Sequence, residues 1–209
     1  MITLTPIKDP AKLQEYFWFR YRIYSESKVK VLANETDGTD RDEFDDRAHH
    51  FGWYVEGKLA GCVRFIEPDA SKAPIPMLSY LTDQEGVAAV RAYMAQRITC
   101  GQPMVEASRF CLAPAFRGLR TAREFVLAMV ATMQPLGVEH GLFDVRAEHA
   151  SFYRLLGFQH VGQQTAYPVP ALGMTWSIFQ YDFRELVGRN KELYERMGFT
   201  QGTQTRKAA

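Results

Sequence analysis

The chain has 209 residues, of which 46% are hydrophobic and 23% are charged, and its formal net charge at pH 7 is +1. This length suffices for one domain with a full core, and the balanced charge argues against a nucleic-acid-binding surface of clustered lysine and arginine. No apolar run reaches the roughly 18 residues that a membrane-spanning helix needs, so we expect no transmembrane segment.

The three cysteines are odd in number and lack the spacing of metal ligands. Two of them, Cys62 and Cys111, lie in apolar runs that are typical of strands. A small buried thiol is the common form of such a cysteine. We therefore expect free cysteines, no metal site and a location in the reducing cytoplasm.

The N-terminal half predicts a strand, a helix, a long loop and a hairpin. Residues 1–7 alternate, and Asp9-Pro10 is typical of a helix start, which predicts a helix to about Ser25. Residues 26–48 are charged and show no periodicity, which indicates a long loop of functional importance. Residues 51–66 predict a hairpin that turns at Glu56-Gly57-Lys58.

The C-terminal half alternates between helical and strand-like patterns. Helices are expected at 83–98, 121–134, 148–156 and 184–197, and strands at 103–112, 141–146, 158–161 and 173–183. This order predicts an α/β fold, a single-domain three-layer α/β/α sandwich with a mixed central sheet over residues 1–198. Residues 199–209 are polar and are expected to form a flexible tail.

The expected strand 103–112 carries three polar residues among apolar ones: Glu106, Ser108 and Arg109. Buried polar side chains on a strand suggest chemistry rather than packing. Simple alternation directs Glu106 and Ser108 to one face and Arg109 to the other. We predict a β-bulge near Ser108, which would bring Glu106 and Arg109 together. Without a bulge, Arg109 would pair with Asp42 or Asp45.

A basic turn follows this strand and leads into the next helix, with the sequence Arg117-Gly118-Leu119-Arg120-Thr121-Ala122. Its successive backbone N–H groups before a helix suit a diphosphate or a phosphopantetheine group. An ordinary basic strand-to-helix loop is the alternative interpretation.

Two motifs together resemble the GNAT superfamily of N-acyltransferases. They are the Arg-Gly-x-x-x-Ala turn at 117–122 and the Ala-x-Phe-Tyr-x-x-x-Gly-Phe run at 150–158. The resemblance implies a GNAT-like mixed central sheet, and it implies that Tyr153 donates a proton to a departing thiolate. A packed aromatic ring is the other interpretation of Tyr153. Arg120 stands where that superfamily often has glycine, which suggests a carrier other than free coenzyme A.

Four further elements resemble the signature set of the acyl-homoserine-lactone synthases. They are Arg20-x-x-x-Tyr24, Asp42-x-x-Asp45, Gly61-Cys-Val-Arg64 and Glu106-x-Ser-Arg109. That family commonly has a tryptophan about six residues after the first element, whereas this chain has Lys28-Val-Lys-Val31. The combination of this set with the run at 150–158 is similar to the N-acyl amino acid synthases.

The resemblance implies an enzyme, an N-acyltransferase that moves an acyl group to the amine of a small, amino-acid-like acceptor. The donor would be the acyl-phosphopantetheine of acyl carrier protein, or acyl-CoA, and no cofactor would be bound permanently. Glu106 is the candidate base, through a water, because burial raises the pKa of a carboxylate. Backbone N–H groups of Phe110, Cys111 and Leu112 would stabilise the oxyanion.

The remaining candidate residues fall into three groups. Ser108 and Arg109 are expected to act in catalysis beside Glu106, and substrate binding is expected of Arg20, Tyr24, Asp42, Asp45 and Arg64. Arg20, Asp42, Asp45, Arg64 and Arg109 are expected to form one polar network that shapes the loop over the site. A structural ion-pair cluster is the alternative for this network. Contact with an acidic acyl carrier protein is expected of Lys28, Lys30, Arg117, Arg120 and Arg123. The aromatic strands 51–54 and 174–181 are expected to line a slot for the acyl chain.

Three other functions remain open at this point. The chain could be an acyl-homoserine-lactone synthase that uses S-adenosylmethionine, or a generic acetyl-CoA N-acetyltransferase. It could also be a non-catalytic protein that keeps the fold and senses an acyl ligand.

Overall fold

A computed structural model describes residues 2–27, 37–69 and 74–199. Its centre is an eight-stranded sheet with the order β1-β2-β3-β4-β5-β8-β6, and β7 pairs with β8. The strands are β1 (Thr5–Pro6), β2 (His49–Val55), β3 (Lys58–Ile66), β4 (Met104–Leu112), β5 (His140–Arg146), β6 (Gln159–His160), β7 (Tyr167–Val169) and β8 (Met174–Asp182). Strands β4 and β5 pair in parallel, whereas the other described pairs are antiparallel.

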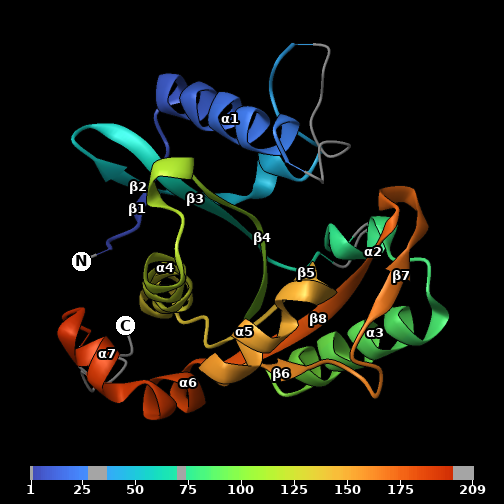
Figure 1. Ribbon diagram of the computed structural model, residues 1–209. Coiled ribbons are helices and arrows are strands. Elements are labelled where there is room, and N and C mark those ends of the chain that lie inside the picture. Colours follow the sequence, from blue (N-terminus) through green and yellow to red (C-terminus); the bar gives the residue numbers. More distant parts are fainter. Residues whose placement is uncertain (1, 28–36, 70–73, 200–209) are drawn as a thin grey trace.

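Helices cover both faces of this sheet (Figure 1). They are α1 (Pro10–Ser25), α2 (Met77–Tyr80), α3 (Gln84–Thr99), α4 (Leu119–Thr132), α5 (Ala150–Leu156), α6 (Phe183–Arg189) and α7 (Lys191–Arg196). The mixed sheet between two helical layers confirms the predicted α/β/α sandwich.

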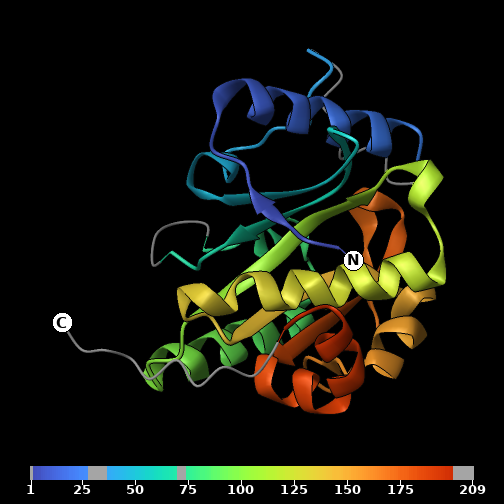
Figure 2. The same cartoon turned by 90° about the vertical axis from the view of Figure 1, so that its left-hand side faces the viewer.

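Alternate residues of the strands show which helix packs on which face. On β3, Cys62 packs in the cluster with α1, and its neighbour Val63 packs in the cluster with α4. On β4, Met104 packs with residues of α2 and α3, and Val105 packs with α4. Helices α1, α2 and α3 therefore cover one face, and α4 covers the other. Figure 2 shows α4 crossing in front of the sheet, with β1, β2 and β3 between it and α1.

The first helix begins as the sequence predicts. Asp9 caps it by accepting a hydrogen bond from the backbone N–H of Lys12 at 3.0 Å, and Pro10 occupies the first helical position. Within the helix, Tyr16, Phe17 and Arg20 are buried against the sheet. The arginine on the apolar face of α1 is therefore fully inside the protein, not at the edge of the helix.

Several boundaries differ from the sequence-based expectation. The first strand is reduced to Thr5–Pro6, and α2 and β7 were not predicted. The expected helix 184–197 is two helices that break at Asn190, whose side-chain amide donates to the carbonyls of Leu156 and Leu186. These hydrogen bonds compete with continuation of the helix. Most of the expected tail, residues 200–209, lies outside the described residues.

None of the helices in the described ranges has the length and apolar character that a membrane crossing requires.

Candidate active site

A buried cluster of charges joins the loop before β2 to helix α1 and to strands β3 and β4. Its members are Arg20, Arg64, Arg109, Asp40, Asp42 and Asp45. Three guanidinium groups face three carboxylates, so their charges balance. Burial of charge is tolerated when it is paired and hydrogen-bonded in this way.

Arg20 connects two of the carboxylates. Its Nε donates to Asp40 Oδ2 at 2.7 Å, and its Nη1 donates to Asp45 Oδ1 at 2.7 Å. Arg64 Nη1 lies 3.0 Å from the other oxygen of Asp45 and donates to Asp42 at 2.6 Å. Although burial acts to raise the pKa of Asp45, the two arginines hold that pKa well below its usual value.

The sequence predicted this network and missed one member. Arg20, Asp42, Asp45, Arg64 and Arg109 come together as expected. The missed member is Asp40. It lies in an acid-rich loop without periodicity, where no sequence pattern distinguishes it from the neighbouring aspartates. The four residues Arg20, Asp42, Asp45 and Arg64 are not on the wall of the cavity described below, so their contact with substrate remains a prediction.

The predicted β-bulge is present beside Ser108. In the pairing of β3 with β4, Cys62 faces Cys111 and Arg64 faces Ser108, so two steps on β3 match three steps on β4. Within this bulge Arg109 has a φ of 54°, in the left-handed region that is uncommon for side-chain-bearing residues. The extra residue therefore changes the direction of the following side chains.

The bulge directs Arg109 toward aspartates rather than toward Glu106. Arg109 Nη2 donates to Asp42 at 3.1 Å, and its Nε lies 2.9 Å from Asp40 Oδ2. Among the described residues, no hydrogen bond or ion pair joins Arg109 to Glu106. The expected meeting of these two residues is thus not observed, because ionised carboxylates compete successfully for the guanidinium group.

A cavity of about 830 Å³ opens where β4 and β5 separate. The pairing of these strands runs from Met104 opposite His140 to Glu106 opposite Leu142, and then stops. Beyond that point, residues 107–112 of β4 and 143–146 of β5 line the cavity. Its volume lies within the range of small-molecule sites, about 300 to 1,000 Å³.

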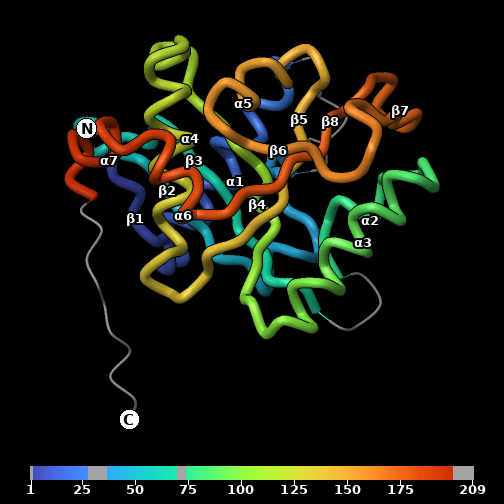
Figure 3. Tube along the Cα trace, turned by 90° about the horizontal axis from the view of Figure 1, so that it is seen from below, coloured from blue at the N-terminus to red at the C-terminus, as the bar shows by residue number. Residues whose placement is uncertain are grey.

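The cavity has an apolar side and a polar side, on opposite faces of the sheet. Phe143 belongs to the core cluster with α4, whereas Leu142 belongs to the cluster with α2 and α3. Alternation therefore places Asp144 on the face of α2. We call the two parts the apolar chamber, lined by Val126, Met129, Phe143, Val145, Phe152 and Tyr153, and the polar chamber, lined by Tyr24, Tyr80, Ser108, Arg109 and Asp144. Figure 3 shows α4 and α5 well apart from α2 and α3.

Glu106 is fully buried behind the polar chamber and does not line the cavity. Its Oε2 accepts a hydrogen bond from the backbone N–H of Met77 at 2.9 Å, and its Oε1 has no hydrogen-bond partner. Burial first, and then the charge of Asp144, raise the pKa of Glu106 from 4.5 to about 8. The raised pKa agrees with the sequence-based expectation for a carboxyl group on an apolar strand.

Sequence reasoning missed two residues of the polar chamber. Tyr80 Oη donates to Asp144 Oδ2 at 2.6 Å, and burial raises the pKa of Asp144 to about 6 against the effect of this hydrogen bond. Asp144 lies in the apolar run 141–145, which is the signal that singled out Glu106, so it could have been found. Tyr80 could not, because α2 was not predicted.

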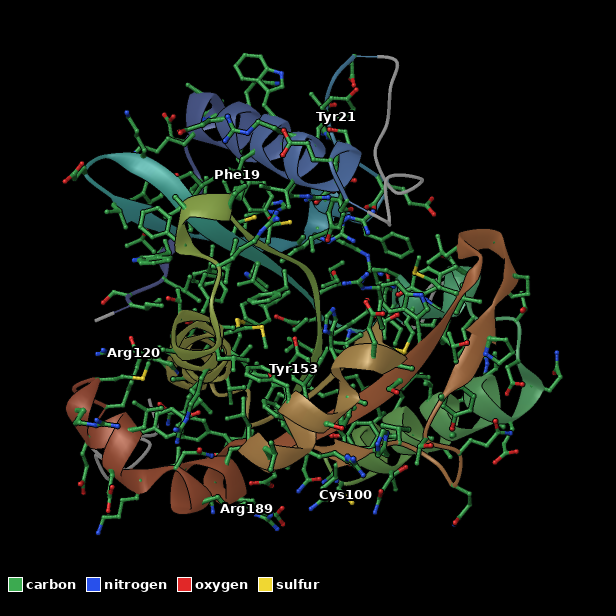
Figure 4. The ribbon with its side chains drawn as sticks, viewed as in Figure 1. Phe19, Tyr21, Cys100, Arg120, Tyr153 and Arg189 are labelled. Carbon is green, nitrogen blue, oxygen red and sulfur yellow. The ribbon has the colours of Figure 1, made fainter. Side chains whose placement is uncertain are left out.

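Tyr153 and the end of β4 contribute to the cavity wall. The ring of Tyr153 packs against Phe143 at a centroid distance of 5.1 Å, and burial raises its pKa well above the usual value. Figure 4 shows Tyr153 in the interior of the molecule. The predicted oxyanion-binding segment, Phe110 to Leu112, also lines the cavity. Tyr24 lies there too, with the guanidinium carbon of Arg109 5.6 Å from its ring centre.

The basic turn borders the apolar chamber. Gly118 is the N-cap of α4 and no side chain caps the helix, so its first N–H groups are available to a ligand. Four of the six predicted residues line the cavity, namely Arg117, Gly118, Leu119 and Ala122, whereas Arg120 and Thr121 do not. The side chain of Arg120 is 91% exposed, pairs with Glu124 and points away from the molecule (Figure 4). Lys28 and Lys30 lie outside the described residues.

The prediction that the aromatic strands 51–54 and 174–181 line a slot for the acyl chain is largely wrong. No residue of 51–54 lines the cavity, because Trp53 packs against Phe116 and Phe125 instead. From 174–181, Trp176 alone reaches it.

The described cysteines and acids offer no metal site. Cys62 and Cys111 are buried free thiols, and Cys100 is exposed. Across the described ranges, no group of three or more histidine, cysteine, aspartate or glutamate side chains is arranged to hold a metal ion.

A model of the family described as N-acyl amino acid synthase FeeM matches residues 15–175, more than half of the chain. The chain belongs to this family. It is accordingly an N-acyltransferase, which confirms the resemblance to N-acyl amino acid synthases. No curated protein matches the chain.

Solved structures share the fold of this family member over nearly its whole length. The structure of FeeM, an N-acyl amino acid synthase from uncultured soil microbes, is similar with a TM-score of 0.63 and 17% identity, covering 90% of this chain and 94% of that one. BjaI, a CoA-dependent acyl-homoserine lactone synthase solved with SAM and isopentyl-CoA, has a TM-score of 0.68, 19% identity and coverages of 96% and 90%. MesI, another CoA-dependent acyl-homoserine lactone synthase, has a TM-score of 0.65 at 18% identity, with full coverage of both chains.

Proposed function

We propose that this N-acyltransferase moves a fatty acyl group from the phosphopantetheine thioester of acyl carrier protein to the α-amine of an amino acid. The observation that carries the proposal is the cavity with two chambers at the separation of β4 and β5. An apolar chamber suits an acyl chain and a polar chamber suits an amino acid. The thioester carbonyl would lie between them, beside the end of β4.

The reaction requires a neutral amine, stabilisation of an oxyanion and a proton for the departing thiolate. We assign the base to Glu106, which acts through an intermediary because it does not line the cavity. Beyond Glu106, β4 has no pairing with β5, so backbone N–H groups of Phe110, Cys111 or Leu112 that point toward β5 are available to the oxyanion. Tyr153, on the wall of the apolar chamber, is the proposed donor to the thiolate.

The basic turn supports a phosphate-bearing donor. The uncapped start of α4 suits the phosphate of phosphopantetheine, and a side chain at Gly118 would meet no atom within 4 Å, so the turn borders open space. Arg117, Arg120 and Arg123 surround this helix start and would attract the acidic surface of a carrier protein. The bulky and exposed Arg120 favours such a protein over free coenzyme A.

An acyl-homoserine-lactone synthase is the second candidate. The buried arginine–aspartate network, which contains the residues that resemble that family, favours it. In that case the acceptor would be S-adenosylmethionine and the product a lactone.

Mass spectrometry of reactions with purified protein tests these assignments. Acyl-carrier-protein thioester, acyl-CoA and acetyl-CoA are each offered with a mixture of amino acids or with S-adenosylmethionine. We expect an N-acyl amino acid, formed fastest from the carrier-protein thioester. A lactone product would support the second candidate, and turnover with acetyl-CoA alone would contradict the proposed donor.

A further inference from the structure

Asp144 differs from the three aspartates of the charge cluster because, among the described residues, it has no ion-pair partner. Asp40, Asp42 and Asp45 each contact an arginine. In the described part of the chain, by contrast, no lysine, arginine or histidine forms an ion pair with Asp144, although it lies on the wall of the polar chamber. The hydroxyl of Tyr80 donates to its Oδ2, and no other described side chain donates to it.

Helix α2 holds Asp144 and Glu106 together on one face of the sheet. Its first residue, Met77, donates its backbone N–H to Glu106, and its last residue, Tyr80, donates its hydroxyl to Asp144. The charge of Asp144 acts on Glu106, so the two carboxyl groups are electrostatic neighbours. Asp144 is the one of the pair that is accessible from the cavity.

The other groups that face Asp144 leave its charge only partly compensated. From α2 comes Tyr80, and from β4 come Glu106 and Arg109, the latter already paired with Asp40 and Asp42. On β5 itself, Arg146 pairs with Glu148 at 2.8 Å. Opposite on β8 stands Ile178, which carries no charge. A carboxylate in such surroundings is stabilised by a cation supplied from outside the chain.

We propose that Asp144, held in place by Tyr80, is the carboxylate that binds the ammonium group of the acceptor amino acid. This inference rests on the proposed function, in which an amino acid occupies the polar chamber. Glu106 keeps the role of base, and the ammonium group is bound next to it. Asp144 is thus a specificity-determining residue that selects acceptors with a primary ammonium group.

Steady-state kinetics of Asp144→Asn test the inference against a purely structural tie between α2 and β5. Asparagine keeps an acceptor for the hydroxyl of Tyr80 but loses the charge. We expect the acceptor KM to rise by about 10- to 100-fold, as for loss of one charge-assisted contact, while the donor KM stays constant. We also expect the acid limb of the pH profile to move to lower pH, because the charge that raises the pKa of Glu106 is gone.

Two variants serve as comparisons. Tyr80→Phe keeps the charge of Asp144 and loses the anchor, so we expect a smaller rise of the acceptor KM, in the same direction. Glu195→Gln removes a half-exposed carboxylate of α7, which forms an ion pair with Lys191, and should leave both KM values unchanged. Unchanged kinetics in Asp144→Asn, with lower thermal stability alone, would overturn the inference and support the structural tie.

A binding measurement separates this inference from the proposed function. Saturation-transfer NMR is recorded with a mixture of the twenty amino acids and with their N-acetyl derivatives, without any acyl donor. We expect the parent to bind one or more free amino acids but not their N-acetyl forms, and Asp144→Asn to lose this preference. A parent that binds no free amino acid, or an equal preference in the variant, overturns the inference. A parent that binds amino acids but forms no product overturns only the proposed function.

Discussion

Two kinds of carboxylate lie on neighbouring elements, and their surroundings give them opposite properties. Asp45 is held ionised by Arg20 and Arg64, which lower its pKa. Glu106 and Asp144 have no ion pair in the described residues, and burial raises their pKa values to about 8 and about 6. The first kind suits a rigid support, and the second suits proton transfer and binding near neutral pH.

The base assignment predicts a specific pH dependence. Glu106 must be ionised to accept a proton, and its pKa is about 8. We therefore expect kcat/KM to increase with pH below about 8 and to level off above it. Glu106→Gln should lower kcat/KM by about 10²- to 10⁴-fold and abolish this limb. A variant that retains the limb at the same pH would exclude Glu106 as the base.

The raised pKa of Glu106 also affects folding stability, which should decrease with rising pH while kcat/KM increases. A carboxyl group whose folded-state pKa is raised favours folding below its unfolded pKa of 4.5, and this contribution is lost as pH rises through about 8. Glutamine has no such titration. We expect the melting temperature of Glu106→Gln, relative to that of the parent, to increase as the pH is raised from 5 to 9. A constant difference across that range would show that the pKa of Glu106 is not raised.

The candidate residues could be predicted from the sequence where an unusual residue type stands in a clear pattern. Glu106 and Arg20 were found in this way, because each interrupts an apolar period. Asp40 and Tyr80 lie in segments without a period, and their roles depend on contacts with distant elements. Such contacts are set by the fold and leave no local signal.

At the scale of elements, the described part of the loop before β2, residues 37–48, is held in place mainly by its aspartates. Asp40, Asp42 and Asp45 attach it to α1, β3 and β4 through arginines. The bulge of β4 contributes by turning Arg109 toward the loop. The left-handed backbone conformation of Arg109 costs about 1 to 3 kcal/mol of conformational free energy. Loop and bulge thus form one unit that supports the wall of the polar chamber.

Removal of one buried cation from this unit should be strongly destabilising. Arg20→Met would leave three carboxylates facing the two remaining guanidinium groups, Arg64 and Arg109, and this one uncompensated buried charge costs about 3 to 5 kcal/mol of unfolding free energy. Arg41→Met is the matched control in the same loop, because its pair with Asp46 is exposed and should contribute less than about 1 kcal/mol. Urea unfolding measures both. Equal losses in the two variants would contradict the supporting role of the network.

The bulge shows how far reasoning about elements from the sequence extends. The polar residues Glu106, Ser108 and Arg109 could not all be accommodated by a regular strand, so an irregularity was predictable. Its outcome was not, since the partner of Arg109 depends on Asp40, which lies in the loop. Likewise α2 has only four residues, too few for a helical period to be recognised.

At the scale of the whole molecule, the separation of β4 from β5 makes a passage through the sheet. The apolar chamber opens toward α4 and the basic turn, and the polar chamber opens toward α2. Donor and acceptor would therefore approach from opposite faces and meet between the strands. The order of helices and strands in the sequence predicted the three layers of the fold. The point where β4 and β5 separate depends on tertiary packing, which has no signal in the periodicity of the sequence.

This arrangement predicts that a charge change at the start of α4 affects the donor alone. Arg120→Glu should raise the apparent KM for acyl carrier protein by about three- to tenfold at low ionic strength, and the effect should fade with added salt. Lys191→Glu is the control, because Lys191 is also exposed and also pairs with a glutamate four residues later. An unchanged apparent affinity in Arg120→Glu would rule out docking at this surface.

The central claim, transfer of a fatty acyl group to an amino acid, is tested most directly by the lipid that accumulates when the chain is expressed. Mass spectrometry compares organic extracts of cells that express the parent with extracts of cells that express Glu106→Gln. The account predicts an ion in the parent extract that equals a fatty acid plus an amino acid minus water, and its loss in the variant. An acyl-homoserine lactone, or the same ion at equal abundance in both extracts, would contradict it.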